Sequence, residues 1–319
     1  MPFAALRSTI DPLVRLLLLA ILLASVLPVR GLAQEIAQQV SNAAIFVLFL
    51  LNGLRLPRAE VLRGVGHWRL LLPLVLWSFG AMALAGFGLW KLTDGWLQPV
   101  VALGFLYLGT LPSTVQSATA YSSLAGGNIA VSVVAAALLN IAGVFVTAPL
   151  FALLGGGEAV SLGYDGLIKI ATILLLPFFL GQVLQNRFGH LTRDYRTLAT
   201  WMDRISIAIA IYVAFSAAVV QGIWSLIEPG DWLGLLAGVA VFLAFGFGGA
   251  WILARGLGLA RPDAISMLFA GGQKSIAMGA PLAAILFSPA DAGLILLPVL
   301  IYHLVQLILS APLAKRLAR

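Results

Sequence analysis

The sequence has few charged residues and no cysteine. Charged residues make up 10% of the 319-residue chain, 61% is hydrophobic, and the mean hydropathy is +1.04. Soluble globular proteins are about half apolar and about a quarter charged, so this composition excludes a soluble domain, a disordered or collagen-like chain and a nucleic-acid-binding arm. The lack of cysteine excludes disulfide frameworks, iron–sulfur clusters, thiolate zinc sites and cysteine nucleophiles.

Long apolar runs take the place of charged surface along most of the chain. Since a spanning helix needs about 20 residues, these runs predict an all-α polytopic membrane protein with ten transmembrane helices. Charged residues, glycines and prolines separate the predicted spans, which lie at 12–29, 36–54, 68–90, 97–125, 128–153, 166–186, 203–224, 232–254, 262–287 and 291–312.

The net charge of +7 comes from basic loops that alternate along the chain. With the N-terminus inside, three basic residues fall outside (Arg30, Lys91 and Lys169) and fifteen fall inside. The positive-inside rule therefore predicts cytoplasmic N and C termini, in a multi-pass protein of the cell (inner) membrane whose basic loops lie against anionic lipid. The fifteen inside residues are Arg7, Arg15, Arg55, Arg58, Arg63, Arg69, Arg187, Arg193, Arg196, Arg204, Arg255, Arg261, Lys315, Arg316 and Arg319.

The first span has a second interpretation. Basic residues followed by the apolar run Leu16–Val29 resemble a cleavable signal peptide over residues 1–33. Arg30 lies close to the candidate cleavage site and argues against cleavage, which would also leave nine spans. We therefore expect the first span to be retained, with cleavage as the alternative.

The ten spans divide into two sets of five, over residues 12–153 and 166–312. Because five is odd, a duplicated five-helix unit enters the membrane in opposite senses, which is the inverted-repeat plan of secondary transporters. The fourth span of each half is rich in helix breakers and polar residues, at Leu111–Ser117 in the first half and Ala270–Ser275 in the second.

Nine of the fourteen residues from Thr110 to Ser123 carry a hydroxyl or amide group. Pro112 lacks a backbone donor, so the helix is expected to break or kink there. Non-helical backbone at membrane depth needs protein or a water-lined cavity around it. The segment indicates a binding site that includes Thr114, Gln116 and Ser117, and the alternative is that these side chains only cap or connect helices.

Lys274 is the only charged residue deep within a predicted span. An ammonium group at the bilayer centre costs about 2.5–3.5 kcal/mol on insertion scales, so it must face a polar cavity, pair with an anion or give up its proton. Gly271 and Gly272 let the backbone unwind or let another helix approach closely. With Gln273 and Ser275, Lys274 is a candidate solute- or proton-binding group; the structural alternative is a cation that ties loosened carbonyls together.

Four further polar residues are of interest on neighbouring helices. His303 and Gln306 lie three residues apart on one face of the last span. His303 is a candidate proton relay, and a packed, hydrogen-bonded histidine is the alternative. Asn128 is expected to cap a helix, and Ser132, one turn further along, is expected to face the same cavity.

The sequence lacks the common signatures of enzymes. It has no Walker A motif, no nucleotide-binding fingerprint, no HExxH and no GxSxG. The run Gly246–Gly249 is apolar and indicates close helix packing in place of a phosphate loop. No acidic residue lies deep within a span, so an intramembrane protease has no acid to use, and we expect a protein that is not an enzyme.

Several motifs resemble the bile acid:sodium symporter superfamily, in particular its bile acid symporter-like (SBF-like) branch. They follow the same order over nearly the whole chain and are Leu111–Ser117, Ser123–Ala130, Leu176–Gln182, Gly272–Ser275 and Tyr302–Leu307. The resemblance implies two inverted repeats, a panel of helices 1, 2, 6 and 7, and a core of helices 3–5 and 8–10. It also implies that broken helices 4 and 9 cross, with solute binding beside the crossing and transport by alternating access.

The resemblance also implies a sodium site, with differences. The bile-acid-transporting members hold sodium with Ser or Asn on helix 4, Ser and Thr on helix 5, and Glu and Gln on helix 9. Here Ser117, Ser132 and Gln273 match three of these ligands, whereas Ala136 replaces the threonine and no carboxylate precedes the glutamine on helix 9. Lys274 lies beside the missing glutamate, where an ammonium can substitute for sodium and repel it. We therefore expect uniport or proton coupling.

The sequence thus predicts a secondary active transporter of a small organic, anionic solute in the lipid bilayer. The coupling ion is H⁺ or Na⁺, no other cofactor is expected, and Lys274 serves as the counter-charge of the solute. We expect no nucleic acid and no obligatory protein partner. The alternative is a non-transporting membrane protein of the same fold that regulates or senses ions or lipids.

Overall fold

The computed structural model describes residues 11–55, 67–155, 168–222, 225 and 227–319. Within this part of the chain every regular element is a helix, apart from a single β-bridge between Asp94 and Leu97. Parts of the predictions lie outside the described residues, namely Arg7, Arg58 and Arg63 of the charge pattern, residues 1–10 of the leader alternative, and span residues 166–167 and 223–224.

The helices follow the predicted apolar runs in order. They are α2 (Pro12–Val26), α3 (Leu32–Arg55), α5 (Trp68–Leu76), the π-helical turn η2 (Trp77–Ala81), α6 (Met82–Thr93), α7 (Pro99–Thr110), α8 (Gln116–Leu124), α9 (Ile129–Leu154), the π-helical turn η3 (Ile170–Leu175), α11 (Leu176–Asp194), α12 (Arg196–Val220), α14 (Pro229–Gly256), α15 (Arg261–Gly272), α16 (Ile276–Leu286) and α17 (Pro289–Leu317).

Seven helical stretches of the described chain are long and apolar enough to cross a membrane. They are Leu32–Arg55, Trp68–Thr93, Ile129–Leu154, Ile170–Asp194, Arg196–Val220, Pro229–Gly256 and Asp291–Leu317. The protein is therefore an all-helical, multi-pass membrane protein. The other three predicted spans contain shorter helices, namely α2 and the pairs α7–α8 and α15–α16, so the count of ten spans stays a prediction.

Capping residues explain where two of these helices begin. The side chain of Asp11 accepts a hydrogen bond from the N–H of Leu13, and Pro12, which lacks an N–H, occupies the first turn of α2. The side chain of Asn128 accepts from the N–H of Val131 at the start of α9. The predicted helix cap at Asn128 is confirmed.

The chain divides into two compact units. Unit 1 contains Met1–Arg55, Tyr164–Trp224 and Ala283–Leu294, and unit 2 contains Leu56–Gly163, Ser225–Leu282 and Ile295–Arg319. Helices α2, α3, α11 and α12 belong to unit 1, and they correspond to the panel helices implied by the resemblance. Helices α5 to α9, α14 and α15 belong to unit 2, while α16 and α17 contribute to both units.

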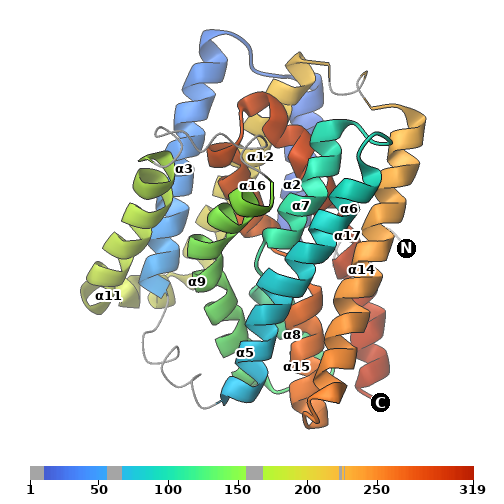
Figure 1. The fold of residues 1–319 in the computed structure, drawn as a ribbon. Coiled ribbons are helices and arrows are strands. Elements are labelled where there is room, and N and C mark those ends of the chain that lie inside the picture. Colours follow the sequence, from blue (N-terminus) through green and yellow to red (C-terminus); the bar gives the residue numbers. More distant parts are fainter. Residues whose placement is uncertain (1–10, 56–66, 156–167, 223–224, 226) are drawn as a thin grey trace, which may run out of the picture. The chain divides into compact units, whose positions relative to one another are not determined.

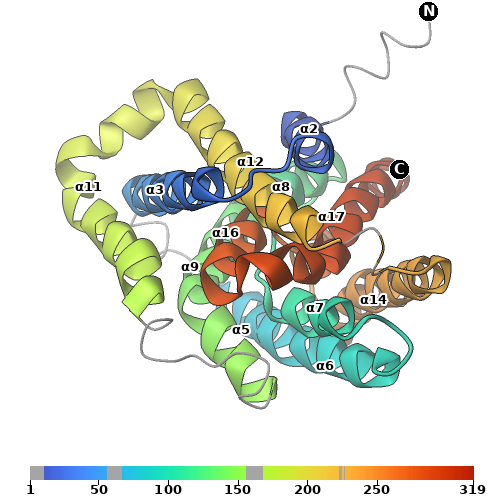
Figure 2. The same cartoon turned by 90° about the horizontal axis from the view of Figure 1, so that it is seen from above.

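In unit 1, α3 lies between α11 and α12 (Figure 2). Two glycines set the close contact of α3 with α11. A Cβ atom at Gly53 would lie 2.2 Å from the carbonyl oxygen of Phe178, and one at Gly181 would lie 2.4 Å from that of Leu50. Because backbone atoms cannot swing away as side-chain ends can, both positions require glycine.

In unit 2, α6 packs against α7 and α14 packs against α15 (Figure 1). The glycine-rich run of α14 allows close contact with α17 and η2. A Cβ atom at Gly246 would lie 2.9 Å from the hydroxyl of Tyr302, and one at Gly249 would lie 2.1 Å from the ring of Trp77, whereas one at Gly248 would meet nothing within 4 Å. The predicted packing role is confirmed for two of these glycines.

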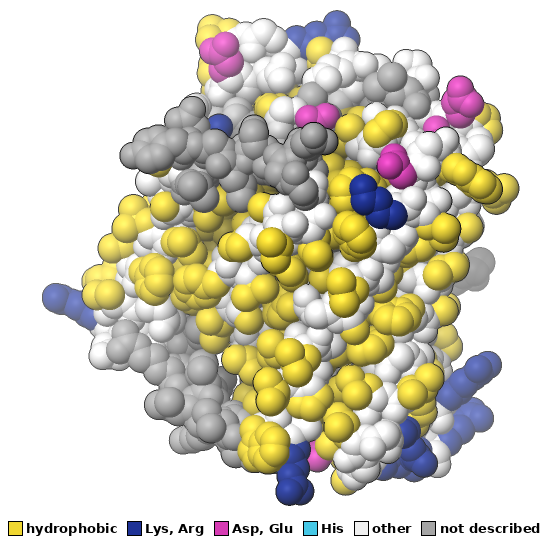
Figure 3. Space-filling view, viewed as in Figure 1, with side chains coloured by type: hydrophobic (Ala, Val, Ile, Leu, Met, Phe, Trp, Pro, Cys, Tyr) yellow, Lys and Arg dark blue, Asp and Glu magenta, His cyan; other side chains and the backbone are white. Residues whose placement is uncertain are grey.

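Apart from the buried Lys274, the charged side chains described for unit 2 lie at its two ends. Figure 3 shows Lys and Arg gathered where α5 begins and α14 and α17 end, with hydrophobic side chains between this end and the other. The basic residues of this end include Arg69, Arg255, Arg261, Lys315 and Arg316. The other end, where α6 ends and α14 begins, carries Lys91, Asp94, Glu228 and Asp231. The apolar surface between the two ends is the part suited to lipid.

Candidate functional site

Two interrupted helices meet in a buried part of unit 2. α7 ends at Thr110 and α8 begins after residues 111–115, and Pro112 lies in this break, where it was predicted. α15 ends at Gly272, and residues 273–275 separate it from α16. The two breaks are joined by a backbone hydrogen bond, in which the N–H of Ser275 donates to the carbonyl of Pro112 at 2.9 Å.

Gly271 and Gly272 are the last residues of α15, so the helix is interrupted only after them. A Cβ atom at Gly272 would lie 2.7 Å from the ring of Phe247, and one at Gly271 would lie 3.0 Å from the ring of Trp77. Neither glycine has a positive φ. Of their two predicted roles, the close approach of a neighbouring helix is the one that these glycines fulfil.

The side chain of Lys274 connects three parts of the backbone. It is 1% exposed, and its ammonium group donates to the carbonyl oxygens of Leu111 at 2.6 Å, Gly109 at 2.9 Å and Ser78 at 3.0 Å. These three bonds use all the N–H groups of the ammonium.

The three acceptors of Lys274 lie where helices leave carbonyls available. Gly109 and Leu111 belong to the C-terminal end of α7, where carbonyls lack an intrahelical partner and the helix dipole is negative. Ser78 belongs to η2, and a π-helical turn displaces carbonyls from the regular α-helical pattern. The ammonium group is thus surrounded by backbone carbonyl dipoles. This arrangement matches the structural alternative for Lys274, in which its side chain joins carbonyls that the helix breaks leave without partners.

The backbone of Lys274 is held by α17. The side-chain amide of Gln306 accepts from the N–H of Lys274 at 2.8 Å and donates to its carbonyl at 2.9 Å. Nδ1 of His303 lies 2.7 Å from the amide nitrogen of Gln306 and 3.5 Å from the carbonyl oxygen of Lys274. His303 is 5% exposed, so it is a packed histidine that contacts the break between α15 and α16.

Side chains from η2, α9 and α17 bind further carbonyls at the crossing. Thr147 donates to Thr110 at 3.0 Å, Asn140 to Ser113 at 3.1 Å, Trp77 to Gly271 at 3.1 Å and Tyr302 to Gly272 at 2.6 Å. Buried backbone carbonyls require hydrogen-bond partners. These donors allow non-helical backbone to be buried inside the protein, as was expected for a break at membrane depth.

Gln273 binds two hydroxyl groups of the candidate site, one from the break before α8 and one from α8 itself. Its side-chain oxygen accepts from Thr114 at 2.5 Å and from Ser117 at 2.7 Å, and its amide nitrogen donates to Ser310 at 3.1 Å. Gln273 is completely buried, whereas Ser117 is partly exposed. The structure therefore brings Gln273, Thr114 and Ser117 together in one cluster.

Three other predicted site residues have no hydrogen bond to Gln273, Thr114 or Ser117 in the described structure. Ser132 donates to Ser122 at 2.7 Å, and Ser122 lies 3.1 Å from the hydroxyl of Ser266, so these three form a separate serine cluster. Gln116 is exposed at the start of α8. Ser275 accepts a backbone N–H with its hydroxyl at the start of α16 and acts as a cap. The sodium ligands implied by the resemblance thus fall into two clusters.

Sequence reasoning missed several residues of the crossing, including Trp77, Ser78 and Ser310. Ser310 lies one helical turn after Gln306, so extending the face of α17 that begins at His303 would have found it. Ser78 takes part through its carbonyl, a group that every residue has. No sequence signal distinguishes such an acceptor.

The chemistry of the crossing is that of amides, hydroxyls, backbone carbonyls and one ammonium. Within the described chain, no group of three or more His, Asp or Glu residues is placed to hold a metal ion. Hydrogen-bonding groups around a single buried cation suit the reversible binding of a polar or anionic molecule.

Known proteins resemble this chain along most of its length. Residues 11–319 match the SBF-like CPA transporter family. The chain is 38% identical over 304 residues to "Uncharacterized protein PA2026" of Pseudomonas aeruginosa, with 95% of this chain and 91% of that one covered. It is 36% identical over 312 residues to "Putative symporter YfeH" of Escherichia coli K12 (97% and 93% covered), and 24% identical over 294 residues to "Sodium/bile acid cotransporter 7" of Danio rerio (86% and 82%). The resemblance predicted from the motifs is confirmed, and the chain belongs to the SBF-like CPA transporter family.

Proposed function

We propose that this protein is a secondary transporter, and not an enzyme, that moves a small organic anion across the inner membrane by alternating access. Its transporter family supports this class of function, as do the words symporter and cotransporter in the names of its relatives. The division into two compact units supports a cycle in which one unit moves as a body relative to the other. The solute site of this proposal lies at the crossing of the interrupted helices.

The proposal includes ten spans in two inverted repeats, over residues 12–153 and 166–312, with both termini in the cytoplasm. The interruptions support the repeat, because each falls in the fourth span of its half. The separation of charges in unit 2 supports the orientation. The end of unit 2 with Arg69, Arg255 and Arg261 faces the cytoplasm under the positive-inside rule.

The coupling proposal depends on one observation, the contact of the Lys274 ammonium group with three buried carbonyls. In transporters with interrupted helices, such carbonyls coordinate the coupling Na⁺ or H⁺. Here the lysine supplies positive charge at this position, and the same charge repels a nearby sodium ion. We infer that the protein works without sodium, either as a uniporter or with proton coupling.

The same charge attracts an anionic solute to the crossing. Since all three N–H groups of Lys274 already have acceptors, the solute is attracted by the field of the ammonium and is bound by other groups. Gln116 is exposed and Ser117 is partly exposed. These two side chains at the start of α8 are the solute-binding groups of the proposal.

Flux measurements test transport directly. Purified protein is reconstituted in liposomes, and uptake of radiolabelled taurocholate and of smaller carboxylates and sulfates is followed with a Na⁺ gradient, a H⁺ gradient or neither. We expect Na⁺-independent uptake of at least one of these anions, absent from empty liposomes. Uptake that requires Na⁺ would refute only the coupling proposal and would leave the transport proposal standing. No uptake under any gradient would favour the non-transporting alternative.

Thermal stability tests the role of Lys274 separately. A ligand that binds only the folded state raises stability by mass action. At constant ionic strength we expect the wild type to melt at the same temperature in Na⁺, Li⁺ and K⁺. We expect Na⁺ to stabilise Lys274→Glu selectively and to leave the uncharged control Lys274→Gln unchanged. Selective stabilisation of the wild type by Na⁺ would contradict the substitution of sodium by lysine.

A further inference from the structure

The corner between α11 and α12 in unit 1 concentrates basic side chains that the transport site does not use. α11 ends at Asp194 and α12 begins at Arg196, with Tyr195 between them. The basic residues of this corner are Arg187, His190, Arg193, Arg196 and Arg204, and its acidic residues are Asp194 and Asp203.

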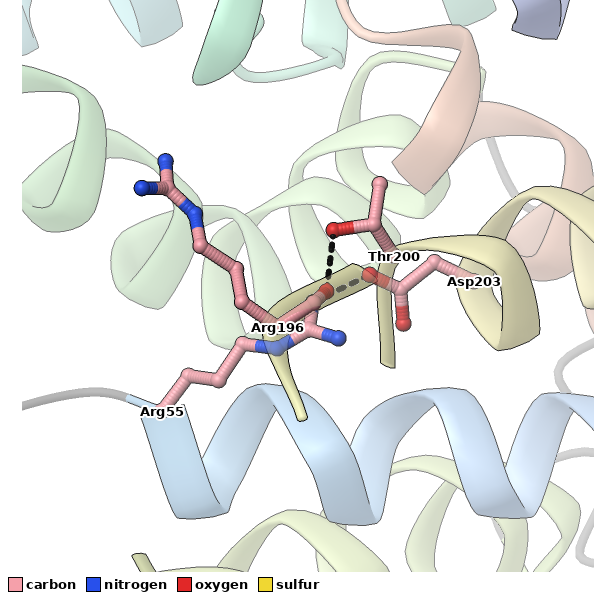
Figure 4. Close-up of polar contacts among 4 residues, drawn as sticks. All are labelled: Arg55, Arg196, Thr200 and Asp203. Carbon is pink, nitrogen blue, oxygen red and sulfur yellow. Dashed lines mark hydrogen bonds and ion pairs between the residues drawn. The ribbon is translucent and has the colours of Figure 1, made fainter. Parts of the chain in front are cut away.

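One of the two carboxylates already has a partner. Asp203 forms an ion pair with Arg55 at the end of α3, and the two side chains are 15% and 27% exposed. Figure 4 shows the guanidinium group of Arg196 extended away from Asp203, while the hydroxyl of Thr200 donates to the carbonyl of Arg196. The carboxylate of Asp203 is therefore directed to Arg55 and does not neutralise Arg196.

The remaining arginines leave the corner with an excess of positive charge. Arg204 has a carboxylate from the start of α2 at 4.0 Å. Arg187, Arg193 and Arg196 are exposed, and no ion pair within 4.0 Å involves any of them in the described part of the chain. Against these three arginines the corner has one further acidic residue, Asp194.

Exposed apolar and aromatic side chains flank the arginines. They are 38% to 61% exposed and comprise Phe188, Leu191, Tyr195, Leu198 and Trp201. Figure 3 shows a basic side chain that projects from the surface beside α11. Tyr and Trp are enriched where a membrane meets water, and basic residues beside exposed apolar ones are typical of helices that lie at this interface.

We propose that the α11–α12 corner binds the headgroup of an anionic phospholipid. Arg193 and Arg196 contact the phosphate, because guanidinium groups bind phosphate oxygens in pairs. The flanking apolar side chains contact the acyl chains. A soluble polyanion would leave these apolar side chains in water, and this is why we assign the corner to a lipid.

A lipid titration of the full-length protein in detergent tests the proposal. The rise in melting temperature is measured with dioleoylphosphatidylglycerol, with zwitterionic dioleoylphosphatidylcholine and with inorganic phosphate. We expect the half-saturating concentration of phosphatidylglycerol to increase roughly fivefold for each arginine removed in Arg193→Gln and Arg196→Gln. Arg193→Lys and Arg196→Lys keep the charge but lose the paired contact, so their half-saturating concentrations should lie between those of the wild type and the glutamine variants.

Arg30→Gln is the matched control, since Arg30 is an exposed arginine of the same unit between α2 and α3. It should bind phosphatidylglycerol as the wild type does. An unchanged titration of the Arg193→Gln/Arg196→Gln double variant would overturn the assignment to this corner. Equal stabilisation by phosphatidylcholine would overturn the role of headgroup charge, and a full effect of inorganic phosphate would overturn the assignment to a lipid.

Discussion

Replacing Lys274 by methionine tests whether the ammonium group holds the crossing together. Methionine is apolar and of similar length, so the main change is the loss of three hydrogen bonds to buried carbonyls. Hydrogen bonds to charged groups contribute about 1.5–3 kcal/mol each, so the three contribute roughly 5–9 kcal/mol before desolvation is considered. The desolvation cost of the buried ammonium, several kcal/mol, disappears in the variant. We therefore expect Lys274→Met to lower the free energy of unfolding by about 3–5 kcal/mol.

Tryptophan fluorescence during thermal unfolding measures this loss, because the chain contains eight tryptophans. Lys169→Met is the control, since Lys169 is exposed at the start of η3 and its loss should leave the melting temperature nearly unchanged. If Lys274→Met melts at the same temperature as the wild type, the lysine is not needed to stabilise the carbonyls of the crossing. The proposal that it substitutes for a bound cation would then be refuted.

Two further substitutions test the packing of each unit by the same assay. In unit 2, Gly249→Ala puts a methyl group 2.1 Å from the ring of Trp77 and should destabilise the protein by about 1–3 kcal/mol. Its control is Gly248→Ala, which should be neutral or slightly stabilising because a methyl group there meets nothing within 4 Å. Equal effects of the two substitutions would contradict the close approach of α14 to Trp77. In unit 1, Arg55→Met leaves Asp203 unpaired and should cost about 1–3 kcal/mol, less than for a fully buried pair since both side chains are partly exposed. Adding Asp203→Leu should recover part of that loss, and a double variant less stable than either single one would contradict the pairing.

The sequence allowed the interruption of α7 and α8 to be predicted because proline acts locally. Pro112 lacks a backbone donor wherever it occurs in a helix, so its effect does not depend on tertiary contacts. The cap at Asn128 was predictable for the same reason, since its amide reaches the N–H of a residue only three positions ahead. The cluster of Gln273 with Ser117 depends on contacts between distant parts of the chain. This cluster could still be predicted from the sequence, because polar side chains in an apolar span have few partners available.

The sequence did not allow the acceptors of Lys274 to be predicted. All three are backbone carbonyls, which are chemically the same at every residue, and which of them lack an intrahelical partner depends on where a helix ends. Ser132 was expected to face the same cavity, and its hydrogen bond could not be predicted either, since its hydroxyl belongs to the serine cluster of Ser122 and Ser266. The position of a residue one turn beyond a cap predicts which face of the helix its side chain occupies. It does not predict which other helix packs against that face.

Unlike a bound sodium ion, a lysine side chain cannot leave its site. Lys274 is attached to the chain, and its backbone is anchored to α17 through both polar groups of the Gln306 amide. In the uniport form of the proposal, in which Lys274 keeps its proton throughout, its charge travels with the protein in both directions of the cycle, loaded or empty, and cancels over a complete turnover. In a uniport cycle the only net charge moved is that of the solute. A membrane potential that is negative inside would then drive the anion outward, by about 2.3 kcal/mol per charge and 100 mV, and such a carrier would work as an electrically driven exporter.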